Sequence, residues 1–103
     1  MANGLQARSK PNGATDTNLF VATTPIVVTL NICNLNTSGA EEAYVSVVPS
    51  GDAAGQAHLI ENSTDVAAKG VIERTGIVLA AGDAIIVKSA AGNLSFNVWG
   101  VEL

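Results

Sequence analysis

The feature of this sequence that most constrains its fold is an alternation of large aliphatic residues with other residues, at a period of two. Residues 26–33 read IVVTLNIC, and residues 43–48 and 94–99 alternate in the same way. Successive side chains of a β-strand point to opposite faces of the sheet, so each segment is predicted to be a strand with one buried face. No segment of useful length places its apolar residues at helical spacing.

Shorter segments complete a chain that is predicted to be all-β. They are rich in Val, Ile and Thr, which pleated sheets favour, and they span residues 18–21, 57–61, 71–74, 77–79 and 84–88. Turn residues separate the segments at 34–39, 49–52, 80–83 and 90–93. Seven or eight short strands predict a single antiparallel β-sandwich, Ig-like or jelly-roll-like, with a small barrel as the alternative. The predicted core includes Val28, Leu30, Ile32, Val45, Val47, Ile85, Val87, Phe96 and Val98.

The first seventeen residues differ from the rest of the chain. They are polar, with Leu5 as the one large apolar residue after Met1, and they carry a net charge of +1, whereas residues 18–103 carry −5. Such a segment cannot bury enough apolar surface to offset the entropy of ordering it. We therefore expect an extended N-terminal arm, residues 1–17, ahead of a β-sandwich domain, residues 18–103. The arm is predicted to become ordered only on assembly, where Arg8 and Lys10 could contact an acidic neighbour and the main chain could pair with a strand edge of that neighbour. A terminus without a role is the alternative.

Composition excludes several classes of protein. Charged residues make up 14% of the chain and the net charge is −4, so no basic surface for a nucleic acid is expected. The single cysteine, Cys33, excludes an intramolecular disulfide and a Cys-based zinc site. No apolar run approaches the roughly 20 residues that span a bilayer, and no signal-peptide pattern is present. We expect a protein that is made in a cytoplasm and does not enter a membrane.

No catalytic, cofactor-binding or metal-binding residues are predicted. His58 is the only histidine, and no nucleophile motif flanks it, so a solvent-facing or hydrogen-bonded structural role is expected. The loop carboxylates lack the regular spacing of a calcium site. A glycosidase pair among them stays open geometrically, although a bare sandwich rarely offers the deep cleft that it needs. The interpretation is that the chain is not an enzyme and needs no cofactor.

The candidate contact residues are two aromatic and two basic side chains. Tyr44 and Trp99 fall on the non-core side of their strands by alternation, and large exposed aromatics are typical anchors of protein interfaces. Arg8 and Lys10 could form charge-assisted hydrogen bonds with an acidic neighbour. A sugar-binding platform around Trp99 is the alternative. The low charge also predicts apolar strands at the surface, and hence a homo-oligomer or a larger assembly.

Four segments carry a resemblance to a known type of protein. They are VTLNICN at 28–34, GVIERTGIVL at 70–79, AGD at 81–83 and SFNVWGVE at 95–102. Together they resemble small β-sandwich structural proteins of tailed bacteriophages, notably those of cyanophages and marine phages, over about residues 17–103. The closing segment and the Glu-Arg-Thr-Gly stretch are the most specific parts.

The resemblance implies a non-enzymatic component of the virion. The first hypothesis is a capsid decoration (cement) protein that binds and stabilises the shell of the major capsid protein. The alternative is a small tail or fibre component, which could include a module that binds a glycan of the host surface. The implied partners are the major capsid protein or other virion proteins, and further copies of the chain itself.

Overall fold

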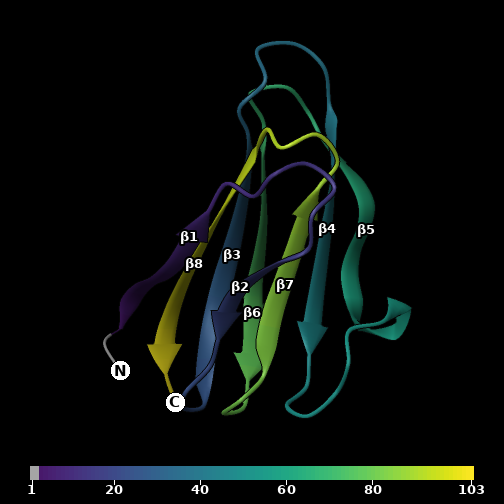
Figure 1. Cartoon of the computed structure of the whole chain (residues 1–103). Coiled ribbons are helices and arrows are strands. Elements are labelled where there is room, and N and C mark those ends of the chain that lie inside the picture. The colour runs from purple at the N-terminus through teal and green to yellow at the C-terminus, as the bar shows by residue number, and fades with distance from the viewer. Residues whose placement is uncertain (1–2) are drawn as a thin grey trace.

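Two four-stranded antiparallel sheets pack face to face in the computed structural model, which describes residues 3–103 (Figure 1). Within those residues the chain forms eight strands and one short 3-10 turn. In chain order these are β1 (Gly4–Ser9), β2 (Thr17–Val21), β3 (Ile26–Asn34), β4 (Glu41–Val48), η1 (Gln56–His58), β5 (Leu59–Val66), β6 (Val71–Leu79), β7 (Ala84–Ser89) and β8 (Leu94–Glu102). The all-β prediction and the β-sandwich prediction are confirmed.

The strand order identifies the type of sandwich. One sheet, here called sheet A, has the order β1-β8-β3-β6, and the other, sheet B, has the order β2-β7-β4-β5. Each strand of the first half therefore pairs with its counterpart from the second half: β1 with β8, β2 with β7, β3 with β6 and β4 with β5. A long hairpin of paired strands that is rolled into two sheets is a jelly roll. Of the two types predicted from the sequence, the chain adopts this one.

Two of the predicted strands are one strand in the structure. The segments predicted at 71–74 and 77–79 join as β6, and the pairing of β6 with β3 shifts register between them. Gly76 lies at this irregularity with φ +70°, a conformation that favours glycine because other residues meet a steric cost there. The residues between the two predicted segments therefore form a β-bulge within a continuous strand.

The core lies between the two sheets and holds the predicted residues almost without exception. Eight of the nine predicted core residues, Phe96, Leu30 and Ile32 among them, have side chains that are at most 1% exposed. Val47 is the exception, since it is half-buried and packs against the rim of the core. The alternation in the sequence therefore predicted the inward face of β3, β7 and β8 correctly.

The prediction of a separate N-terminal arm is wrong for Gly4–Ser9. This segment is β1, an edge strand of sheet A that pairs with β8 from Gly4 opposite Gly100 to Ser9 opposite Phe96. Ala7 packs against the core and Pro11 is buried. Residues 4–9 bury few apolar side chains, and main-chain hydrogen bonds with the edge of β8 in the same chain compensate for their ordering instead. Residues 1 and 2 of the expected arm lie outside the described residues.

Candidate interaction surface

The outer face of sheet A is formed by the side chains that alternate with the core. On β8, exposed or half-buried residues alternate with fully buried ones from Leu94 to Gly100, and β3 follows the same rule. The pairing register places the outward residues of neighbouring strands side by side. The outward positions on the two central strands are Val27, Thr29, Asn31 and Cys33 on β3, and Ser95, Asn97, Trp99 and Val101 on β8.

One half of this face is apolar. Val101 on β8, Val27 on β3 and Val78 on β6 lie in one row across three strands, and in the adjacent row Leu5 of β1 lies beside Trp99. The exposed fractions are 42% for Trp99, 55% for Val101 and 65% for Val78. A contiguous apolar patch on a sheet is typical of a surface that meets a partner, whereas single exposed apolar residues are ordinary.

A hollow of about 250 Å³ lies next to Trp99 within this patch. Its walls include Val27, Thr29 and Val101, and Gly4 and Gly100 lie beside it. A Cβ atom at Gly100 would come within 2.7 Å of the Ile26 side chain and 2.9 Å of the Val28 side chain, so a larger residue would displace core side chains where β8 pairs with β3. The hollow and the tryptophan together give the patch both a projecting group and a recess.

The other half of the face is polar except for Val71 of β6, which is exposed opposite Cys33, and it contains one polar row of four residues. Arg8 on β1 pairs with Asn97 on β8, Asn97 pairs with Asn31 on β3, and Asn31 pairs with Glu73 on β6. Arg8 and Glu73 are exposed. The row therefore crosses all of sheet A with a cation at one edge, an anion at the other and two amides between them.

Three of the four predicted contact residues come together on this face. Arg8 and Trp99 project from it, and Lys10 lines a second hollow, of about 240 Å³, together with Arg8 and Asn97. Tyr44 does not belong to the same surface, because β4 is a strand of sheet B. The expectation that Trp99 lies outside the core is correct, but the two aromatic anchors lie on opposite sides of the sandwich.

Tyr44 borders a separate hollow of about 320 Å³ on sheet B, lined also by Asp16, Asn62 and Lys88. The Lys88 ammonium lies 4.3 Å from the centroid of the Tyr44 ring, a cation–π geometry. Ser63 Oγ donates a hydrogen bond of 2.6 Å to the Tyr44 hydroxyl. These contacts hold the ring in place, so Tyr44 is a wall of a polar recess and not a free anchor.

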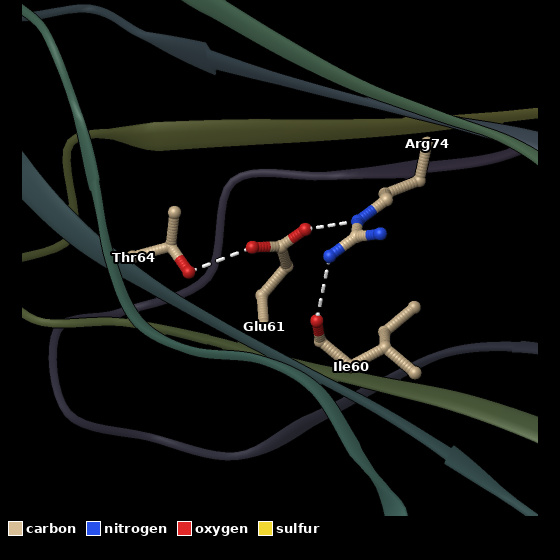
Figure 2. Close-up of polar contacts among 4 residues, drawn as sticks. All are labelled: Ile60, Glu61, Thr64 and Arg74. Carbon is tan, nitrogen blue, oxygen red and sulfur yellow. Dashed lines mark hydrogen bonds and ion pairs between the residues drawn. The ribbon is translucent and has the colours of Figure 1, made fainter.

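A buried carboxylate joins the two sheets at one open side of the sandwich. Glu61 of β5 accepts hydrogen bonds from Thr64 Oγ1 and from Arg74 Nε of β6, and Arg74 Nη2 donates to the Ile60 carbonyl at 2.9 Å (Figure 2). Burial alone raises the pKa of Glu61, but the hydrogen bonds from Thr64 and Arg74 and the charge of Arg74 outweigh it and lower that pKa. Glu61 and Arg74 thus connect β5, an edge of sheet B, to β6, an edge of sheet A.

A second buried carboxylate holds two loops together at one end of the sandwich. Glu41 Oε2 accepts hydrogen bonds from the main-chain nitrogens of Ala91 and Asn93, and Oε1 accepts from the amide groups of Asn93 and Asn36. Burial alone raises the pKa of Glu41, but these hydrogen bonds outweigh it and lower that pKa. The β3–β4 and β7–β8 connections are therefore fixed by one anion.

The lone histidine is hydrogen-bonded to the main chain, which was one of the two environments expected for it. His58 Nδ1 accepts a hydrogen bond from the Gly55 nitrogen, and His58 Nε2 lies 3.5 Å from a carboxylate oxygen of Asp52. Cys33 is half-buried on β3 and is a free thiol. Within residues 3–103, no three His, Cys, Asp or Glu side chains are grouped as metal ligands would be, and no helix is long and apolar enough to cross a membrane.

Most of the residues that complete the outer face of sheet A were not identified from the sequence. The apolar half, around Trp99, also contains Leu5, Val27, Val78 and Val101. The polar row that begins at Arg8 also contains Asn97, Asn31 and Glu73. Alternation does place Val27 and Val101 on the non-core side of their strands. What it lacks is the pairing register, which decides the neighbours of each outward residue across the sheet.

No protein-family model, curated protein or solved structure matches this chain.

Proposed function

We propose that this chain is a non-enzymatic structural protein of a tailed-bacteriophage virion, a capsid decoration (cement) protein that binds and stabilises the shell of the major capsid protein. The apolar half of the outer face of sheet A, around Trp99, carries the proposal. Such a surface is costly to leave in water and favours burial against protein. In the assembled particle this face is covered.

The resemblance to phage structural proteins supports the same proposal through its position in the fold. Its three longest segments, residues 28–34, 70–79 and 95–102, coincide with β3, β6 and β8. These are three of the four strands of sheet A. Jelly rolls occur in viral capsid and lectin domains, an analogy at the level of the fold that agrees with both hypotheses about the virion.

The fold suits a protein that stabilises an assembled shell by binding to it. A ligand that binds the assembled shell and not its free subunits stabilises the shell by a free energy that grows with its concentration and affinity. The binding module must be rigid so that little entropy is lost on docking. The hydrogen bonds to the carboxylates of Glu41 and Glu61 already fix two loops and one open side of this sandwich in the free chain.

Quantitative densitometry of purified particles of the encoding phage tests the proposal. A decoration protein is present in many copies, in a fixed ratio to the major capsid protein. Particles from which the gene has been deleted should lose their shells at a lower temperature or in milder denaturant than wild-type particles. A chain that is missing from the particle, or whose loss leaves shell stability unchanged, would contradict the proposal.

The hollow on sheet B favours a second candidate, a tail or fibre module that binds a host-surface glycan. Its aromatic wall, Tyr44, is flanked by Asp16, Asn62 and Lys88, a combination of ring and hydrogen-bonding groups that suits a saccharide. A glycan array probed with the full chain tests it. Binding that Asn62→Ala abolishes and Trp99→Ala leaves intact would favour this candidate, together with a low copy number at the tail. No binding to any glycan would exclude it.

A further inference from the structure

The polar row across sheet A carries one charge at each of its two ends. Neighbouring strands lie about 4.8 Å apart, so Arg8 and Glu73, three spacings apart, are separated by about 14 Å and cannot pair within one chain. Neither side chain forms an ion pair with another residue of the described part of the chain. A favourable partner for this row would present an anion opposite Arg8 and a cation opposite Glu73.

A second copy of the same row meets that requirement. Sheet A is symmetric in width about the line between β8 and β3, with β1 and β6 as its edges. Consider two copies whose A sheets face each other, related by a two-fold axis that runs between the sheets, parallel to the strands and above this line. The axis places β1 of one copy opposite β6 of the partner, and β8 opposite β3 of the partner. Every row then stays opposite itself. Arg8 faces Glu73 of the partner subunit twice, and Asn97 faces Asn31 of the partner subunit twice.

We propose that a second copy of this chain covers the outer face of sheet A, as an isologous dimer with its axis between β3 and β8. The inference rests on the proposed function only for the premise that protein covers this face. It assigns the face to a contact between two copies, so the contact with the shell would be made by other surfaces of the dimer. In such an interface each contact occurs twice, so a self-complementary surface is required. The charge pattern of the row fulfils this requirement.

The apolar rows fit the same axis. Trp99 comes to lie over Thr29 of the partner subunit, beside the hollow that Val27 and Val101 line. Leu5 comes to lie over the bulge at Gly76 of the partner subunit, where open space surrounds the backbone. Aligned sheets cross at about 30°, which displaces the edge strands by only about 4 Å, and an arginine side chain can span that distance.

Charge reversal with mixing tests this arrangement. The variants are Arg8→Glu and Glu73→Arg, and Glu42→Arg on the exposed surface of β4 is a control with the same change of charge as the second. Sedimentation velocity of the purified full chain, without particles, gives the dissociation constant. We expect a wild-type dimer, unchanged in the control, and a constant about tenfold to a hundredfold higher for each reversed variant alone, because symmetry makes both charge contacts repulsive.

An equimolar mixture of the two reversed variants should recover the dimer. In the mixed pair, the carboxylate introduced at position 8 of one variant faces the guanidinium introduced at position 73 of the other. The remaining contact joins the unaltered Arg8 and Glu73, so both pairs become attractive again. Melting by circular dichroism checks that both variants are folded, and Trp99→Ser provides an independent variant that should also dissociate the dimer.

Several results would overturn the inference: a wild-type chain that is monomeric at every concentration, a dimer that tolerates both reversals, or a mixture that fails to associate. A monomer would leave the copy-number test of the proposed function untouched. A dimer that never enters particles would instead contradict the proposed function alone.

Discussion

The carboxylate of Glu41 offers the sharpest test of how the sandwich holds its loops. Glu41→Gln keeps the shape of the side chain but replaces one of two accepting oxygens by a donor. The carboxylate accepts four hydrogen bonds, at 3.0 to 3.3 Å, from Ala91, Asn93 and Asn36. The amide of the glutamine can accept only the two hydrogen bonds that reach its oxygen. Its NH2 group then faces the other two donors, which lose their acceptor.

The expected loss of stability follows from those contacts. A donor that loses its partner costs about 1–3 kcal/mol when it is buried, and less when water can reach it. The donors around Glu41 are half-buried or exposed, so we expect a loss of about 2–3 kcal/mol near neutral pH. For a domain of this size that corresponds to a melting temperature lower by about 10 °C or more.

The same contacts predict how the effect depends on pH. The pKa of Glu41 lies below its ordinary value of 4.5 in the folded chain, so the folded state binds fewer protons than the unfolded state near that pH. The stabilisation is fully present above about 4.5 and is lost as the pH falls through the lowered pKa. The difference between wild type and Glu41→Gln should therefore shrink in strong acid. Glu61 titrates in both proteins and cancels from this difference.

Urea denaturation of both proteins at neutral pH and in strong acid is the assay. Glu42→Gln is the matched control, because Glu42 is the exposed neighbour on the same strand, and we expect a change within about 0.5 kcal/mol there. A Glu41→Gln effect below about 1 kcal/mol at neutral pH would refute the reasoning, since the expected loss for two unmet donors is about 2–3 kcal/mol. So would an effect that is equally large in acid.

Two further predictions concern the core and the first strand. Phe96→Ala should destabilise the chain by about 3–5 kcal/mol, because the ring is fully buried between the sheets; calorimetry showing a loss below about 1 kcal/mol would contradict this packing. Deleting residues 2–9 should lower the free energy of unfolding by about 1–3 kcal/mol, and with it the melting temperature, because the deletion removes β1 and exposes the edge of β8. An unchanged melting curve would mean that β1 contributes nothing to the folded chain.

Much of the fold could be predicted because the sequence pattern and the structure share a period. Where a strand has one buried face, alternation alone separates inward residues such as Phe96 from outward ones such as Trp99. The order of strands in the sheets could not be predicted in this way. It depends on long-range pairing, and the sequence leaves Ig-like and jelly-roll arrangements equally consistent with the same alternating segments.

The first strand was missed for a different physical reason. Residues 4–9 have little apolar surface, and burial of apolar surface was the only compensation for ordering within the chain that the sequence indicated. In the structure the compensation is the main chain of β8, which a side-chain pattern does not show. The bulge at Gly76 was missed likewise, because a glycine in a sequence indicates a turn as readily as an irregularity within a strand.

The candidate surface could be predicted in part only. Arg8, Lys10 and Trp99 were identified from residue type and alternation, and they share one face of the molecule. The partner of Arg8 in the proposed dimer, Glu73, follows only from the register of four strands. A sequence gives the charge of a residue, but it does not give the row in which the residue lies.

Hydroxyl-radical footprinting with mass spectrometry tests most directly whether the outer face of sheet A is covered in the assembled state. Trp99 is the only tryptophan of the chain and is 42% exposed, whereas Tyr44, the only tyrosine, lies on sheet B and serves as an internal reference. The oxidation of both is compared between the phage particle and the purified chain diluted to a concentration at which sedimentation velocity shows a monomer. Strong protection of Trp99 relative to Tyr44 in the particle is the predicted result. Equal oxidation of Trp99 in the particle and in the dilute chain would contradict the account.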